Sequence, residues 1–116
     1  MKKFWKFQAK ANNPKAGELT LYGEISESSW WGDEVTPRQF KSDLEGLGDI
    51  ETLDMYINSP GGDVFAGLSI YNTIKRHNAT VTAHVDGRAA SVASIICMAA
   101  DKIAMPENAE MMIHNA

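Results

Sequence analysis

The sequence predicts a single α/β domain with a mostly parallel sheet. Segments typical of strands alternate along the chain with segments in which apolar residues recur every three or four positions. The predicted strand over residues 51–58 is nearly all apolar toward its end, as expected for a strand covered on both faces. A chain of 116 residues is long enough for one modest core. Strands that alternate with helices form βαβ units with right-handed crossovers.

The N-terminal part of the chain is basic. Residues 1–17 hold five of the eleven Lys and Arg side chains, namely Lys2, Lys3, Lys6, Lys10 and Lys15. We interpret residues 1–17 as a flexible basic arm and residues 18–116 as the folded domain. The first stretch, MKKFWKFQAK, lacks the apolar region of a signal peptide. The alternation of apolar and polar residues in ELTLYGEI then predicts a strand over 18–25.

The next segment has the start and stop signals of a helix. Thr36 is a candidate N-cap, Pro37 suits the first helical position, and Gln39 completes a capping box. The helix is predicted over 36–48, where two glycines end it. The remaining predicted elements are a tight turn (59–63), a helix (64–77), a strand (79–87), a helix (89–101) and two short strands (102–106 and 109–116). Since no closing element follows the last strand, we expect a longer natural protein, incomplete here at its C-terminus.

Composition excludes several function classes. The net charge of −4 argues against a nucleic-acid binder, and no window is apolar enough for a membrane span. The single cysteine, Cys97, lies in an apolar helical run and is interpreted as a buried structural thiol. The three histidines and one cysteine have no metal-ligand spacing. We therefore expect a cytoplasmic protein without metal or cofactor.

Two serines lie among small residues in GRAASVASII, where a strand is predicted to become a helix. Ser91 at a helix start would lie beside free backbone N–H groups and could act as a nucleophile. Taken alone, this segment favours the alternative, a serine that caps the helix. Ser94, one turn further on, favours a structural role more strongly.

The stretch INSPGGDV places two glycines after a predicted parallel strand. Glycine tolerates positive φ, so the N–H of Gly62 could point into the crevice at the carboxyl edge of the sheet. It would then form one arm of an oxyanion hole, although a plain tight turn explains the glycines equally well. The spacing of a phosphate-binding loop is absent.

Histidine is the most common general base. His114 ends an apolar strand, where a buried structural histidine is the more common outcome. His77 and His84 are weaker candidates because they fall in a helix end and in mid-strand.

The order of these motifs resembles a known family, the proteolytic subunit of the Clp protease (ClpP). The matching stretches are INSPGG (57–62), AGLSIYNT (66–73), G-x-AAS (87–91) and MIH (112–114). The segments LYGEI and WWGDEVTP are similar to the prophage head-maturation branch. The resemblance covers residue 18 to the end and implies the ClpP/crotonase-like spiral of ββα units.

The resemblance also implies roles for individual residues. Ser91 matches the nucleophile and His114 the general base of a serine endopeptidase. Gly62 and Val92 match the oxyanion-hole amides. The third residue of the triad, an aspartate, is expected downstream of this chain, so the 116-residue chain alone is expected to be nearly inactive. Asp86, Asp101 and Glu107 do not match its position.

Partners are likewise implied. Relatives form rings, so we expect a homo-oligomer of unknown ring size that cuts protein or peptide substrates. An ATP-dependent unfoldase serves the housekeeping branch, and phage capsid or scaffold protein is the implied substrate of the prophage branch. No nucleic acid and no membrane are expected as partners.

Three other readings stay open. A non-catalytic assembly protein could retain the fold. A crotonase-type acyl-CoA enzyme would use two backbone amides with acidic residues in the crevice. A signal-peptide peptidase would need a serine–lysine pair, and no lysine matches.

Overall fold

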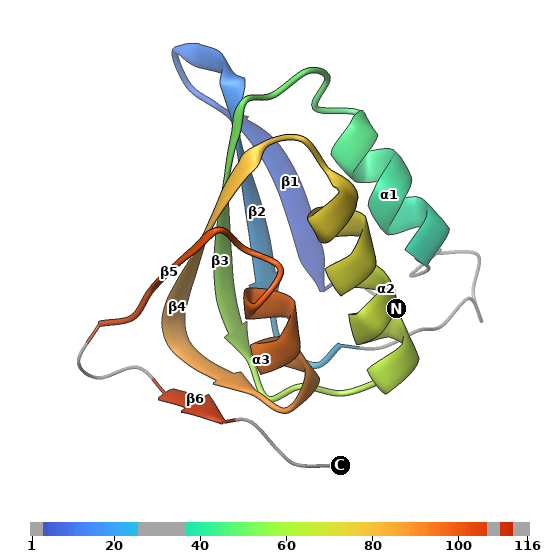
Figure 1. Ribbon diagram of the computed structural model, residues 1–116, viewed down its shortest axis with the longest axis vertical. Coiled ribbons are helices and arrows are strands. Elements are labelled where there is room, and N and C mark those ends of the chain that lie inside the picture. The colour runs from blue at the N-terminus through green and yellow to red at the C-terminus, as the bar shows by residue number, and fades with distance from the viewer. Residues whose placement is uncertain (1–3, 26–36, 107–109, 113–116) are drawn as a thin grey trace.

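The computed structural model describes residues 4–25, 37–106 and 110–112 (Figure 1). Six strands and three helices are present in these ranges. The strands are β1 (Trp5–Lys10), β2 (Asn13–Tyr22), β3 (Thr52–Ser59), β4 (Thr80–Ala90), β5 (Lys102–Ala104) and β6 (Glu110–Met112). The helices are α1 (Pro37–Glu45), α2 (Val64–Arg76) and α3 (Val92–Cys97).

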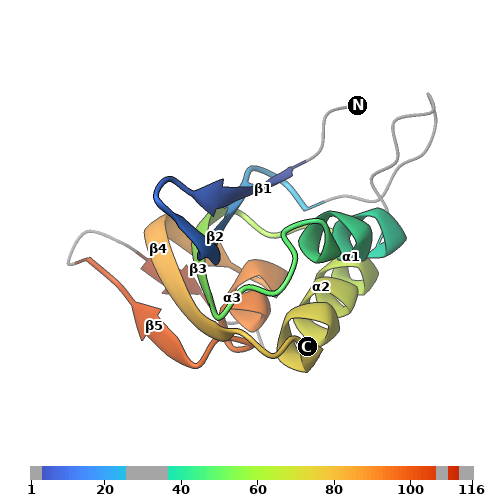
Figure 2. The same cartoon turned by 90° about the horizontal axis from the view of Figure 1, so that it is seen from above.

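The sheet confirms the predicted α/β class. Its order is β1-β2-β3-β4-β5, and β6 also pairs with β4. All neighbours from β2 onward are parallel, and only β1 runs antiparallel. Because the strand order follows the sequence without reversing, right-handed crossovers place every helix on the same side of the sheet. Figures 1 and 2 show α1, α2 and α3 together on that side.

The expectation of a flexible arm over residues 1–17 is wrong for most of that stretch. Strand β1 forms a hairpin with β2, which itself begins at Asn13. The lysines that suggested a solvated arm alternate with apolar residues in WKFQAK, and this alternation is that of an amphipathic strand. Trp5 is buried and packs edge-on against Phe40 of α1. Counting charges over residues 1–17 as a whole missed the alternation of apolar and polar side chains within β1.

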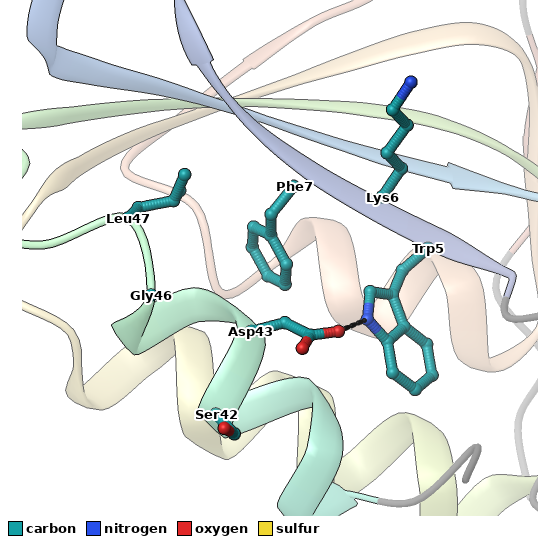
Figure 3. Close-up of a pocket in the computed structure, with 7 residues that line it drawn as sticks. All are labelled: Trp5, Lys6, Phe7, Ser42, Asp43, Gly46 and Leu47. Carbon is teal, nitrogen blue, oxygen red and sulfur yellow. Dashed lines mark hydrogen bonds between the residues drawn. The ribbon is translucent and has the colours of Figure 1, made fainter. Parts of the chain in front are cut away.

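The core lies between the sheet and the helices. Phe40 and Leu44 lie four positions apart on α1, and both are almost fully buried. An indole hydrogen bond of 2.9 Å from Trp5 to Asp43 also ties β1 to α1. Strand β1, helix α1 and the two residues that follow it line an open surface pocket of about 440 Å³ (Figure 3).

Two predicted elements are shorter or shifted. The predicted strand over 18–25 starts five residues earlier, at Asn13, because it pairs with β1 as well as β3. The helix predicted over 89–101 is confined to α3, because Ala89 and Ala90 are still part of β4. The strand-to-helix junction therefore falls at Ser91.

The sheet face opposite the helices carries a polar cluster. Asp54 of β3 bonds to Lys10 and lies 2.8 Å from the Nε2 atom of His84, whose ring stacks on Tyr56. Partial burial pushes the pKa of Asp54 upward, but the hydrogen bonds with Lys10 and His84 outweigh it and lower the pKa below its ordinary value. The bond to Asp54 raises the pKa of Lys10. The pair is therefore charged throughout the neutral range.

This pKa shift predicts a pH-dependent contribution to stability. A carboxylate with a depressed pKa stabilises the fold above its unfolded pKa, about 4, and loses that effect as the pH falls through the folded pKa. We expect Asp54→Asn to lower the free energy of unfolding by about 1 kcal/mol at pH 7 and by much less at pH 3. Urea unfolding at both pH values measures the difference. Glu51→Gln is the matched control. Glu51 pairs with Lys15, but their side chains are 71% and 67% exposed, respectively, so this pair should contribute nothing measurable to the free energy of unfolding. A gap between wild type and Asp54→Asn that is undiminished at pH 3 would contradict this account.

Candidate active site

The carboxyl ends of β3 and β4 meet the starts of α2 and α3 at one edge of the molecule, the lower edge in Figure 1. Ligands of open parallel sheets bind outside the carboxyl ends of the strands. Ser91 and Gly62, both predicted site residues, lie in the two connections at this edge. The topology thus brings together two stretches about thirty residues apart in the chain.

Ser91 has an unusual backbone. Its φ of 54° and ψ of −127° lie outside the regions that side-chain-bearing residues normally occupy. It occupies the N-cap position of α3, yet its side chain makes no capping hydrogen bond. The capping interpretation is therefore wrong, because the hydroxyl does not accept a hydrogen bond from the first turn of α3. A serine on a strained strand-to-helix turn is the geometry of a nucleophile whose hydroxyl is presented at a sheet edge.

Ser94 has the structural role expected for it. Its side chain is fully buried, and its hydroxyl donates to the carbonyl of Ser91 at 2.5 Å. Its backbone N–H donates to the same carbonyl at 3.0 Å. Both bonds hold the turn that carries Ser91.

Gly61 lies directly against Ser91. A Cβ atom on Gly61 would lie 2.8 Å from the Cβ of Ser91, 2.8 Å from the carbonyl of Ala90 and 3.5 Å from the hydroxyl of Ser91. The φ of Gly61 is +101°, which favours glycine independently. The loop after β3 therefore contacts the turn that carries Ser91 through a residue without a side chain.

Gly62 is held from one side only. Ile25 donates its N–H to the carbonyl of Gly61 and accepts the N–H of Asp63, both at 2.8 Å. In such a parallel bridge the N–H and carbonyl of the middle residue, Gly62, point to the opposite side. Within the described part of the chain, the N–H of Gly62 has no acceptor. The sequence had left two explanations for the glycines, a plain tight turn and an amide turned toward the crevice, and this geometry is compatible with the second.

The second predicted amide, that of Val92, begins α3. It follows Ser91 directly, and first-turn N–H groups have no partner within their own helix. The Val92 side chain packs on α2 so closely that a Cβ on Gly67 would lie 2.1 Å from its Cγ2 atom. Tight packing between α2 and α3 therefore fixes the position of this amide.

His114 lies outside the described residues. The nearest described residue in the chain, Met112, ends β6 and pairs with Ala90, the residue before Ser91. The other two histidines do not lie at this edge. His84 is bonded to Asp54 on the polar face, and the Nδ1 atom of His77 accepts the N–H of Ala79 at the end of α2.

Two carboxylates that the sequence left unassigned have other partners. Asp86 accepts the hydroxyl of Tyr22, and Asp101 accepts the N–H of Val81 at 2.8 Å. Glu107 lies outside the described ranges. In the described ranges no three His, Cys, Asp or Glu side chains form a group able to hold a metal ion. No helix of this part of the chain is long and apolar enough to cross a membrane.

Cys97 is buried, as predicted. Burial raises the pKa of its thiol to about 12, and because only the thiolate is a good nucleophile, Cys97 is inert at neutral pH. We expect iodoacetamide at pH 8 to leave Cys97 unmodified in the folded protein and to alkylate it fully in 6 M guanidinium. Mass spectrometry of both samples tests this, and rapid alkylation of the folded protein would contradict it.

Sequence reasoning missed Gly61 and Ile25. The contact of Gly61 with Ser91 and the single bridge of Ile25 depend on how β3 and β4 are aligned. A single amino-acid sequence carries no direct signal for the register between two strands. The only hint was that two adjacent glycines are more than a turn of that length requires.

Comparisons with known proteins identify the family of the chain. The Clp protease family model matches residues 39–116. The ATP-dependent Clp protease proteolytic subunit of Ligilactobacillus salivarius is 54% identical over 63 residues, covering 52% of this chain and 32% of the relative. That of Deinococcus radiodurans is 45% identical over 74 residues, covering 61% and 36%. The chain thus spans about a third of the length of these relatives.

A solved structure of a Clp protease subunit has a similar fold. The crystal structure of the ClpP protease catalytic domain from Plasmodium falciparum superposes with a TM-score of 0.69 at 26% identity, over 88% of this chain and 55% of that one. A family model that matches two thirds of the chain and a shared fold lead to one assignment: the chain belongs to the Clp protease family.

Proposed function

We propose that this chain carries the nucleophile and oxyanion hole of a serine endopeptidase. Ser91 attacks a peptide carbonyl, and His114 removes the proton from its hydroxyl. The N–H groups of Gly62 and Val92 then stabilise the negative charge on the carbonyl oxygen. The intermediate collapses with cleavage of the C–N bond, and His114 gives its proton to the departing amine. In a second step His114 removes a proton from water, the water attacks the ester carbonyl, and the ester bond breaks to release the acid and restore the hydroxyl of Ser91.

The observation that carries the proposal is the backbone of Ser91. A non-glycine residue at positive φ stores strain, and the hydroxyl does not offset that strain by capping α3. The hydroxyl lies against Gly61, and the N–H of the next residue, Gly62, has no acceptor in the described part of the chain. The sequence separation supports the role of His114, which is two residues from Met112, the partner of Ala90 in the sheet.

The third member of the triad is proposed to be an aspartate outside these 116 residues. Asp86 and Asp101 are engaged elsewhere. The chain also spans only about a third of the curated relatives that it matches. Activity is therefore proposed for the full-length protein.

Assembly and substrate are proposed by resemblance to the prophage branch. The protein forms a homo-oligomeric ring and cleaves a capsid or scaffold protein during phage head maturation in the bacterial cytoplasm. An unfoldase is an optional partner. Gel filtration coupled to light scattering reports the ring, and a monomer at micromolar concentration would overturn it.

A fluorophosphonate probe tests the catalytic proposal. Such probes phosphonylate activated serines, and we expect mass spectrometry of the full-length protein to locate the adduct on Ser91. Ser94 is an internal control, because its hydroxyl is buried and bonded to a carbonyl. An adduct on Ser94, or no adduct at all, would overturn the proposal.

A further inference from the structure

The alignment of β3 with β4 changes just before the candidate site. Ile57 pairs with Val85, but the next described pair joins Ser59 to Ala89. Two steps along β3 therefore match four along β4, so β4 bulges outward between Val85 and Ala89. Ser91 follows two residues after this bulge, and the shape of the bulge sets where Ser91 lies.

Asn58 is the residue of β3 opposite the bulge. Its side-chain Oδ1 accepts the N–H of Arg88 at 3.3 Å. The same oxygen lies 3.0 Å from where a Cβ on Gly87 would be, so the amide lies flat on the bulging backbone. The side-chain carbonyl takes the place of a main-chain acceptor that the shifted register no longer supplies. The carbonyl of Asn58 also accepts the N–H of Gly23, which anchors it to the β2 side.

Ser59, the next residue, holds the other arm of the site. Its side chain is 1% exposed, and its hydroxyl accepts the N–H of Gly61 at 3.1 Å. This bond closes a tight turn over the proline at position 60. Together with the bridge to Ile25, it leaves the N–H of Gly62 without an acceptor among the residues that the structure describes.

We propose that Asn58 and Ser59 are positioning residues that set the distance between the nucleophile and the oxyanion hole. Asn58 fixes the bulge that leads to Ser91, and Ser59 fixes the loop that carries Gly62. Their side chains bond to the backbone of Arg88 and Gly61 and act through these residues. The proposal rests on the proposed peptidase function for its kinetic consequence, but the two hydrogen bonds can be tested without it.

The kinetic test measures phosphonylation of Ser91 in the full-length protein, separating the probe's inhibition constant from its maximal inactivation rate. We expect Asn58→Ala and Ser59→Ala each to lower the maximal rate about tenfold and to leave the inhibition constant within about twofold. Asn58→Asp keeps an oxygen acceptor and should stay within about threefold of wild type. Asn72→Ala and Ser69→Ala, the same changes on α2, are matched controls and should leave the rate unchanged. Maximal rates within twofold of wild type for both Asn58→Ala and Ser59→Ala would overturn the proposal.

Amide hydrogen exchange tests the two bonds independently of any activity. Exchange at Arg88 should speed up at least fivefold in Asn58→Ala, and exchange at Gly61 should speed up similarly in Ser59→Ala. Unchanged exchange at both amides overturns the positioning role. If wild type is not phosphonylated while both amides respond as expected, the peptidase proposal fails but the two contacts stand.

Discussion

Replacement of Ser91 by alanine is expected to lower peptide hydrolysis by the full-length protein by roughly 10⁴-fold or more and to abolish fluorophosphonate labelling. Neither Ser94 nor Cys97 is expected to replace Ser91 as nucleophile, because Ser94 is buried and bonded and Cys97 is protonated at neutral pH. Residual labelling at the wild-type rate would show that another residue reacts.

Ser91→Gly adds a second expected result. Glycine occupies the positive φ of this position without strain, whereas alanine keeps the strain of serine. Ser91→Gly should therefore be inactive yet more stable than Ser91→Ala by about 1 kcal/mol, measured by urea unfolding. Equal stability of the two variants would contradict the strained-turn geometry.

Replacement of Gly62 by alanine is expected to have the next largest effect. The new Cβ would lie 2.0 Å from the carbonyl oxygen of Ile25, which is backbone and cannot move aside cheaply. The φ of +144° adds strain. The bridge to Ile25 must break, and the amide of Gly62 loses its direction. Loss of one oxyanion donor typically costs about 10²–10³ in kcat, so we expect Gly62→Ala to lower the maximal phosphonylation rate by at least about 100-fold.

Gly48→Ala separates the loss of the amide from simple backbone strain. Gly48, which follows α1, also has a positive φ, +77°, but a Cβ there would meet nothing within 4 Å. Both variants should lower the melting temperature, and only Gly62→Ala should lower the phosphonylation rate. Equal rate losses in the two variants would mean that destabilisation alone explains the effect.

Local patterns in the sequence predicted much of the fold. Strands β3 and β4 and helix α2 end between one and three residues from their predicted ends. Each combines an apolar pattern with clear stop signals, such as Pro60 and Gly61 after β3. Strand β1 was missed because the five lysines of residues 1–17 led to the interpretation of the whole stretch as a flexible arm. Its role depends on Trp5 packing against Phe40, 35 positions away in the chain, and no local pattern reports such a contact.

The candidate site was predicted in part. Ser91, Gly62 and Val92 lie at one sheet edge, as expected. The positive φ of Ser91, the clamp by Ile25 and the bulge opposite Asn58 were not predicted. Each arises from tertiary register, which positions backbone groups from three segments against one another. Residue identity alone favoured a helix cap at Ser91, whereas in the structure its side chain makes no capping hydrogen bond and its φ is positive.

The most direct test of the account is a crystal structure of the full-length protein with a phosphonate bound to Ser91. We predict one phosphonate oxygen about 2.7–3.1 Å from the backbone nitrogens of Gly62 and Val92, with the imidazole of His114 beside the Oγ atom of Ser91. An adduct whose oxygens face away from both nitrogens, or a His114 ring on the opposite face of the sheet, would contradict it.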